Sequence, residues 1–520
     1  MRQILFILLI IIFLSCPLCY ANNITVSNAT PGEQNIVNNT MIIEFDISWE
    51  NSWRNSTNYD AAWVFFMVST DGGITWKHAT LKSNNDSNPL DDGLGWSKGA
   101  GTDIEIVIPA HIPIIEGDKK GAFIERASNG TGTSLTSNIR FVWDYGSDGI
   151  SDTQASHPVN TNIRVMAIEM VYIPAGPFYL GDGNSASEST YAFHVADNTK
   201  VGPINTSFIH NVKVDTNQYD DNQIETSGIG IDGDEGLDVN NDGGIDNADF
   251  PTGYTAFYVM KYEISQGQYV DFLNSISATQ ATNRYPNQNG LQRHTINKVS
   301  DIYETSTPNR ACNYISWMDI CAYADWAGLR PMTELEFEKA CRGPDEVIVG
   351  EYPWGNTSIY NAPYTIVNDG QANAVILSQP IGVGNASYNT TNGSIGGPLR
   401  CGIFAQSNTS REEAGASYYG VMELAGNLWD RYVTVGNILG RSFLGTHGDG
   451  NLSTNGFATN TDWPGYNAGE VKDAGGSGFR GGSWGFGATN CCTSDREYAA
   501  YTNITRYFHD GGRCARADPR

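Results

Sequence analysis

Positively charged residues are scarce in this 520-residue sequence. It holds 31 lysines and arginines against 57 aspartates and glutamates, which gives a formal net charge of −26. A surface this acidic repels the phosphate backbone of nucleic acids, so no nucleic-acid partner is expected. The same excess of carboxylates favours the binding of cations.

Long apolar runs are absent after the first residues. Residues 4–14 form one short apolar run behind Arg2 and Gln3. The run is too short to cross a membrane comfortably and has the layout of a secretory leader (residues 1–21), with cleavage expected after Ala21. Residues 13–16 form an imperfect lipidation box, so a lipoprotein is the alternative. We therefore expect a secreted or cell-surface protein with no membrane span after leader removal.

Histidine is rare as well. Eight histidines are scattered along the chain, and none of their spacings is typical of zinc or non-haem iron ligands. No nucleotide-binding loop with the Gly-Lys-Ser/Thr signature is present. A carboxylate pair for glycoside hydrolysis stays open, because acids are abundant and their spacing in sequence does not fix their spacing in the fold.

Nine cysteines are present, and their positions are uneven. Cys16 and Cys19 leave with the predicted leader, and the other seven lie between Cys312 and Cys514. In an exported protein most of these are expected to form disulfides. An odd number leaves one thiol free, reactive or bridged to another chain.

Helical periodicity is missing from residues 22–155. Apolar and polar residues alternate at 42–49, as in a half-buried strand. Further strand-like runs lie at 62–68, 74–78, 104–108 and 139–143. The patterns predict an all-β sandwich of immunoglobulin-like size. Four tryptophans are interpreted as its core, with a sugar-binding platform as the alternative: Trp49, Trp53, Trp63 and Trp76.

An acidic insertion at 216–249 contains a calcium-loop pattern. Within it, residues 238–249 place side-chain oxygens at loop positions 1, 3, 5, 9 and 12 and a glycine at position 6, as twelve-residue calcium loops do. The predicted calcium ligands are Asp238, Asn240, Asp242, Gly244 (through its carbonyl), Asp246 and Asp249. A solvated Asn/Asp-rich turn is the alternative reading.

From residue 254 the pattern is mixed. Helical spacing appears at 265–274 and 316–326, and Thr333 with Glu336 forms a capping-box pattern that opens a third helix at 333–341. After Gly343 the chain is rich in Gly, Asn, Ser and Thr, which is typical of long loops. We predict a loop-rich α+β domain over residues 156–520.

Seven segments of this domain occur in the order of a known family. They are residues 170–181, 262–272, 313–343, 352–356, 422–429, 479–484 and 512–516. Together they resemble the formylglycine-generating enzymes, or sulfatase-modifying factors. The resemblance implies that family's C-type-lectin-like fold. It also implies its chemistry, in which a cysteine pair binds copper and oxidises a sulfatase cysteine with dioxygen.

The family's cysteine pair is incomplete in this sequence. By spacing from the Gly-Gly-Ser-aromatic motif, its first cysteine falls on Phe486, its second on Cys491, and the motif serine on Ser483. A phenyl ring cannot ligate copper, so we lean against an enzyme. If the protein is an enzyme, Cys491 and Ser483 are its catalytic residues and copper is its cofactor.

The resemblance also implies structural cysteines and a further cation segment. Cys514 matches one end of the family's scaffold bridge. The partner position falls on Ala324, and Cys321, one helical turn earlier, is expected to serve instead. Cys341 is expected to pair with Cys491 or Cys492. In the family, the segment matching residues 426–429 can also hold calcium.

The C-terminal stretch 485–512 carries aromatic residues without periodicity between fixed framework motifs. It resembles the variable region of proteins diversified by retroelements, which use the same fold. Tyrosine and phenylalanine give large contact areas at low entropic cost. The predicted ligand-binding residues are Phe486, Asn490, Tyr501, Ile504, Tyr507, Phe508, His509 and Asp510. An ordinary divergent loop is the alternative.

These expectations lead to three hypotheses. The first is an exported, calcium-stabilised binding protein that contacts a protein or glycan ligand. The second is a copper-dependent oxidase acting on a sulfatase cysteine. The third is a self-assembling structural subunit of a surface or fibre.

Overall fold

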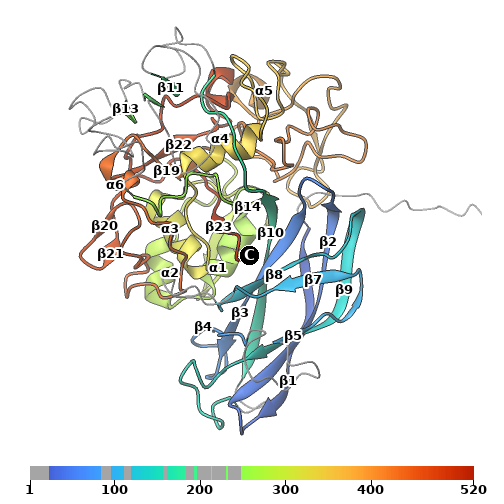
Figure 1. The fold of residues 1–520 in the computed structure, drawn as a ribbon, viewed down its shortest axis with the longest axis vertical. Helices are drawn as coiled ribbons and strands as arrows, with labels where there is room; N and C mark the ends of the chain where they lie inside the picture. The colour runs from blue at the N-terminus through green and yellow to red at the C-terminus, as the bar shows by residue number, and fades with distance from the viewer. Residues whose placement is uncertain are drawn as a thin grey trace, which may run out of the picture.

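The computed structural model describes residues 23–82, 95–109, 119–155, 161–182, 192–195, 212–213, 230–231 and 247–520. It contains 30% strand and 11% helix, a mixed content that agrees with the predicted α+β class. The long strands lie in the N-terminal third, whereas the helices of the described residues all follow residue 260 (Figure 1).

One sheet of five strands belongs entirely to the N-terminal region. Its order is β1–β2–β9–β5, with β6 also paired to β9. The strands are β1 (Thr25–Asn35), β2 (Thr40–Arg54), β5 (Trp96–Ser97), β6 (Ala100–Gly101) and β9 (Gly130–Trp143). Along β2 the residues of one face are buried, from Met41 to Trp49, because alternate side chains of a strand point to opposite faces.

The second sheet has seven strands and joins both regions of the chain. Its order is β23–β14–β10–β3–β8–β7, with β4 beside β3. The strands are β3 (Asp60–Ser69), β4 (Lys77–His78), β7 (Ile104–Val107), β8 (Gly121–Arg126), β10 (Asn162–Ile173), β14 (Phe257–Met260) and β23 (Ala515–Ala517). Because β10 pairs with β3 on one side and β14 on the other, this sheet continues into the later domain. The N-terminal region thus shares a sheet with the later domain, and a separate immunoglobulin-like sandwich is not confirmed.

Strand β3 is buried along its whole length. Val64 and Phe66 face the five-stranded sheet, in a cluster with Phe45 and Phe141. Trp63 and Phe65 face the other way, in a cluster with helix residues. The run of apolar residues at 62–68 is thus explained by burial on both faces.

Four helices cover this second face: α1 (Gln266–Leu273), α2 (Ala278–Arg284), α3 (Trp317–Trp326) and α4 (Glu334–Arg342). Each begins with a capping box, in which the N-cap side chain accepts from the backbone N–H three residues later. The predicted box of Thr333 and Glu336 is confirmed. The Trp63 indole N–H donates to the carbonyl of Ala327 at 2.7 Å, which ties β3 to the end of α3.

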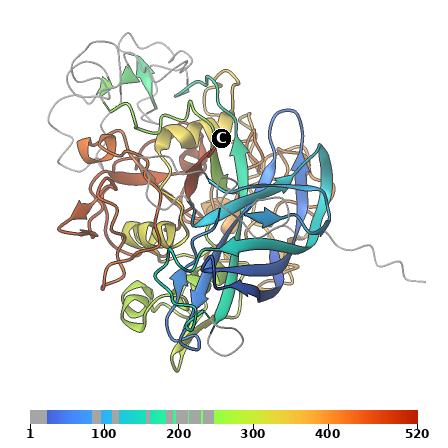
Figure 2. The ribbon, with the colours of Figure 1, turned by 60° about the horizontal axis from the view of Figure 1, so that its bottom comes forward.

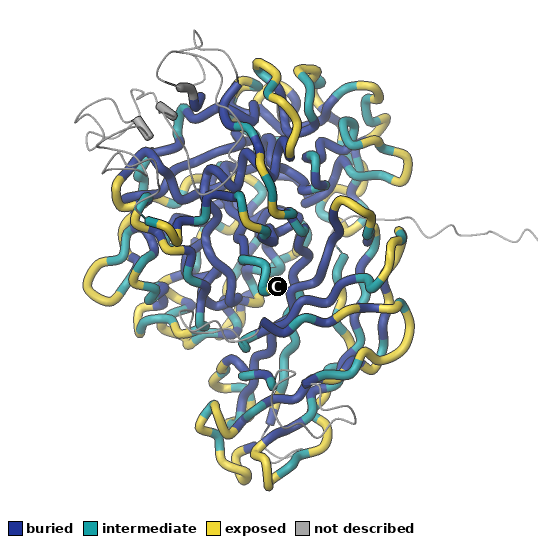
Figure 3. The backbone as a smooth tube through the Cα atoms, in the orientation of Figure 1, coloured by how far each residue is buried: buried dark blue, intermediate teal, exposed yellow. Residues whose placement is uncertain are grey.

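The rest of the domain is built from loops and short elements. They are β11 (His194–Val195), β12 (Val212–Lys213), β13 (Gly230–Ile231), β15 (Ile296–Val299), β16 (Ile302–Thr305), β17 (Ile366–Val367), β18 (Val375–Ile376), α5 (Asn389–Asn392), β19 (Asp430–Val433), α6 (Ile438–Arg441), β20 (Tyr466–Asn467), β21 (Glu470–Val471), β22 (Ser477–Arg480) and the 3-10 helix η2 (Ala488–Cys491). Figure 2 shows these loops beside the long strands, and Figure 3 shows that much of the loop backbone is buried.

None of the predicted disulfides is confirmed. All seven cysteines of the described residues are buried free thiols. Cys341 packs in one apolar cluster and Cys491 in another. Cys321 and Cys514 share a cluster but are not bonded. Burial raises the pKa of each of these thiols.

The four N-terminal tryptophans divide into two kinds. Trp49 and Trp63 are buried core residues, whereas Trp53 and Trp76 are half-buried. Within the part of the chain that the structure describes, no helix has the length and apolarity needed to span a membrane.

Candidate functional site

The C-terminal stretch leaves β22 through a double-glycine turn. Gly481 and Gly482 have φ angles of +87° and +72°, in the left-handed region that favours glycine. A Cβ atom at Gly482 would lie 3.0 Å from the Cys491 sulfur and from the Asn490 backbone. The turn therefore requires a small residue and folds the following loop back against η2. The Trp484 N–H then donates to the Asn427 carbonyl at 2.9 Å, which fixes the start of the loop.

Aromatic rings from this stretch contact one another. The centroid of the Phe486 ring lies 5.1 Å from that of His509 and 5.6 Å from that of Tyr498. His509 lies 5.6 Å from Tyr507 and 4.7 Å from Phe508. Tyr498 lies 6.2 Å from Tyr501. We call these six residues the aromatic surface: Phe486, Tyr498, Tyr501, Tyr507, Phe508 and His509.

The aromatic surface is partly open to solvent. Tyr507 is 40% exposed, and the other five residues are half-buried. Each ring therefore presents part of its area while the remainder packs on its neighbours. Such partly buried rings lose little conformational entropy when a ligand covers them.

A rigid layer lies directly beneath these rings. The buried Trp429 ring contacts Phe486 at 5.1 Å and Tyr498 at 5.3 Å. The His509 Nδ1 atom lies 2.8 Å from the Asp510 carboxylate, and the other Asp510 oxygen lies 3.6 Å from the Arg431 guanidinium on β19. Asp510 and Arg431 are fully buried. Their ion pair therefore anchors the chain next to His509 against β19.

The structure brings together five of the eight residues predicted to bind ligand. Ile504 is 55% exposed but makes no ring contact with the surface. Asn490 and Asp510 are buried, and the Asn490 amide donates to Glu497 at 2.9 Å. The sequence reasoning missed Tyr498, although it lies within the same aperiodic stretch.

The thiols near this surface are enclosed. Cys491 and Cys492 lie in a buried cluster with Tyr352, Trp354 and other apolar residues. Burial raises the pKa of Cys491 well above its usual range and that of Cys492 to about 12. Thiolates, not thiols, ligate copper. With Phe486 in place of the first sulfur, these residues do not fit the family's copper site.

Ser483 and the cation segment after Gly426 are also engaged within the protein. The Ser483 hydroxyl is buried and accepts from the Gly485 N–H at 3.4 Å. The Asn427 amide carbonyl accepts from the Leu399 N–H at 2.8 Å, and the Arg513 guanidinium lies 2.6 Å from the Asp430 carboxylate. The buried Arg513 guanidinium thus already balances the charge of Asp430, the carboxylate next to the predicted cation segment.

The predicted calcium loop lies outside the described residues apart from its last three. Asp249 is exposed, and Phe250 after it is buried. The Asn247 amide donates to the carbonyls of Arg441 and Phe443 at 2.9 Å each. The end of the loop is therefore anchored to the chain around α6.

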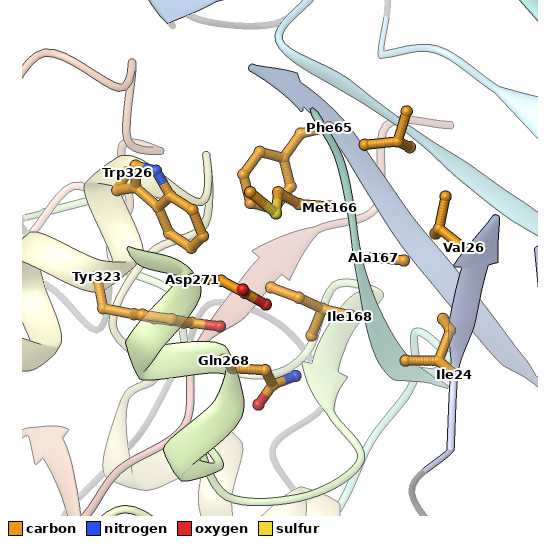
Figure 4. A pocket seen from close by; sticks show the side chains of 11 residues that line it. Ile24, Val26, Phe65, Met166, Ala167, Ile168, Gln268, Asp271, Tyr323 and Trp326 are labelled. Carbon is orange, nitrogen blue, oxygen red and sulfur yellow. The ribbon is translucent and has the colours of Figure 1, made fainter. Parts of the chain in front are cut away.

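A separate pocket of about 220 Å³ opens between β1, β3, β10, α1 and α3. Figure 4 shows Gln268, Asp271 and the hydroxyl of Tyr323 on one side and apolar side chains on the other. Burial of its carboxyl group raises the pKa of Asp271 to about 6, and the Arg164 guanidinium opposes this shift. No sequence pattern predicted this pocket, because its walls come from five distant segments.

Comparison with known proteins defines the class of the later domain. Residues 246–517 match the family described as the sulfatase-modifying factor enzyme 1-like domain. The match spans more than half of the chain, so the chain belongs to this family, and the predicted resemblance is confirmed.

Similar curated proteins are all named formylglycine-generating enzyme. That of Thermomonospora curvata is 48% identical over 52 residues, or 10% of this chain and 16% of the relative. Those of Bos taurus and Mus musculus are 26% and 25% identical over 152 and 153 residues, each covering 22% of this chain and 40% of the relative. The matched regions thus span less than half of each relative.

Proposed function

We propose that this protein is an exported binding protein that contacts a protein or glycan ligand through the aromatic surface. The observation that supports this proposal is the continuous set of partly exposed rings on a buried ionic base. Aromatic side chains in this setting are the usual energetic centre of protein and sugar recognition. The predicted leader supports export.

The copper-oxidase alternative rests on the names of the relatives and on Cys491. Against it stand the phenyl ring of Phe486 at the first sulfur position and the burial of Cys491. Oxygen consumption in the presence of Cu(I) and a sulfatase-type cysteine peptide separates the hypotheses. Sustained turnover that Cys491→Ser abolishes would replace the binding proposal.

Tyr507→Ala is expected to weaken ligand binding at least fivefold, because truncating an aromatic anchor commonly costs about 1 kcal/mol or more. Immobilised glycans and candidate surface proteins serve as probes, with affinities measured by biolayer interferometry. The matched control is Val37→Ala, in the exposed turn between β1 and β2, which should bind as wild type does. Equal binding by both variants would contradict the role of the aromatic surface.

We also propose that residues 238–249 bind calcium and stabilise the acidic insertion. The pattern of oxygen ligands supports this, and the anchored Asn247 would transmit the effect to α6. Saturating calcium is expected to raise the free energy of unfolding by about 3 kcal/mol at a hundredfold excess over Kd.

Thermal melts with calcium and with chelator measure this effect. Asp242→Asn should remove most of the calcium-dependent shift. The control Asp220→Asn lies in the same acidic insertion but outside the twelve-residue pattern, and it should keep the shift. Identical melting temperatures for the wild type with calcium and with chelator would refute the calcium proposal.

A further inference from the structure

Three charged side chains are buried together on neighbouring strands. Asp60 lies on β3, Glu169 on β10, and Lys261 directly follows β14, with β10 in the middle (Figure 1). The Lys261 N–H donates to the Glu169 carbonyl at 2.9 Å, so these residues are opposite each other. The Lys261 Nζ atom lies 3.0 Å from Glu169 Oε2 and 3.4 Å from Asp60 Oδ2.

Water is largely excluded from this cluster. The side chains of Lys261, Glu169 and Asp60 are 5%, 2% and 0% exposed. The Trp53 ring centroid lies 5.0 Å from Nζ. Two carboxylates against one ammonium would leave an excess buried charge, which is costly. Burial raises the pKa of both Asp60 and Glu169, so the cluster favours one protonated carboxyl group.

Asp60 is held as the acyl donor, the carboxyl group that the amine would attack. Its Oδ1 atom accepts from the Ser52 hydroxyl and from the Trp53 N–H, both at 2.9 Å. Its Oδ2 atom accepts from the Trp49 indole N–H at 3.1 Å. Three fixed donors on one carboxyl group polarise it and stabilise negative charge that develops on its oxygens during attack.

Glu169 is placed to carry protons instead. One of its oxygens, Oε2, accepts from the Lys261 amine at 3.0 Å, and the Ile24 backbone also lies within hydrogen-bonding reach of the carboxyl group. Burial by itself lowers the pKa of Lys261, but the carboxylates of Glu169 and Asp60 raise it overall. The amine must therefore give up a proton before it can attack, and Glu169 is the nearest acceptor.

We propose that Lys261 and Asp60 form an intramolecular amide bond, with Glu169 transferring the protons. The lone pair of the neutral Lys261 amine attacks Cγ of the protonated Asp60 carboxyl, and a C–N bond forms. One C–O bond of Asp60 breaks, and its oxygen leaves as water with a proton from the amine delivered through Glu169. No oxidant or cofactor is needed. The product is a neutral amide, which removes two opposite charges from a buried site.

The bond would join β3 covalently to the end of β14. It would link the N-terminal sheet region to the later domain in a chain whose described cysteines are all free thiols. Because the two residues are far apart in sequence, such a link restricts the unfolded chain strongly.

Tryptic peptide mapping of the full-length protein tests the proposal. A linked product consists of residues 55–77 joined to residues 214–284, because trypsin cannot cleave after an acylated Lys261. Its mass should be lower by one water than the sum of the two peptides. Fragmentation should place the branch at Asp60. Unlinked peptides ending at Lys261 would overturn the proposal, and a branch at Glu169 would overturn the choice of Asp60.

Variants test the role of each group. Glu169→Gln is expected to lose the linked peptide while keeping the fold, measured by circular dichroism, and Lys261→Arg should lose it as well. A linked peptide in Glu169→Gln would overturn the proton-transfer role. Lys339 is an internal control, because it is equally buried but donates to the carbonyls of Gly253 and Tyr254. Trypsin should cleave after Lys339 in every sample.

Discussion

Glu334→Gln is expected to lower the free energy of unfolding by about 3–5 kcal/mol, the usual cost of removing one partner from a buried ion pair. The Glu334 carboxylate lies 2.7 Å from Arg496 Nε and 3.2 Å from Arg480 Nη1. It also accepts from the Val435 N–H at 2.8 Å. These groups are buried, so water cannot compensate for the lost charge.

Urea unfolding followed by tryptophan fluorescence measures this loss. Burial opposes the charge of Glu334, but the guanidiniums of Arg496 and Arg480 outweigh it and lower the pKa of the carboxyl. Its contribution is therefore complete above the ordinary glutamate pKa of 4.5 and is lost as pH falls through the folded-state value. The difference between variant and wild type should be largest near neutral pH.

The matched control is Glu44→Gln in the partly exposed pair with Arg140, whose side chains are 31% and 48% exposed. An exposed pair contributes about 1 kcal/mol or less. If Glu334→Gln lost no more stability than Glu44→Gln, the buried network around α4 would not be the stabilising element proposed here.

Local sequence patterns predicted the local elements well. The helix beginning at Thr333 was predicted because its capping box is contained within four residues. The five rings of the aromatic surface that were predicted lie within one aperiodic stretch between two recognisable motifs. In both cases the decisive information is contiguous in the chain.

Long-range pairing could not be predicted in the same way. Strand patterns indicated β3 but not that β10 would lie between β3 and β14. For this reason the sequence could not predict that Asp60, Glu169 and Lys261 lie together. The predicted pairing of Cys341 with Cys491 is not seen for a related reason, since a rule about export says nothing about which buried cluster receives each cysteine.

Asp495→Asn is expected to stabilise the protein by about 2–4 kcal/mol above pH 7, the equivalent of roughly two to three pKa units. Asp495 is 2% exposed, and its Oδ2 atom has no hydrogen-bond partner in the described structure. Burial raises its pKa to about 7; Arg480 opposes this shift and Glu497 adds to it. Asparagine keeps the shape without a charge to bury.

The sign follows from proton binding. Between the ordinary aspartate pKa of 3.8 and the folded-state value of about 7, the folded protein holds a proton on Asp495 that the unfolded chain has released. Wild-type stability from this group therefore falls as pH rises through that window and levels off above it. His78 acts in the opposite direction, because burial lowers its pKa to about 4.

The difference in unfolding free energy between Asp495→Asn and wild type reports on the Asp495 carboxyl alone, because His78 and the other titrating groups are the same in both proteins. Urea unfolding at several pH values should give a difference near zero at pH 4 that grows to its full value by about pH 7. Asp301→Asn, in the exposed turn between β15 and β16, is the control and should show no such growth. A constant difference across this range would mean that Asp495 titrates alike in the folded and unfolded chains, and that burial does not hold its carboxyl group neutral.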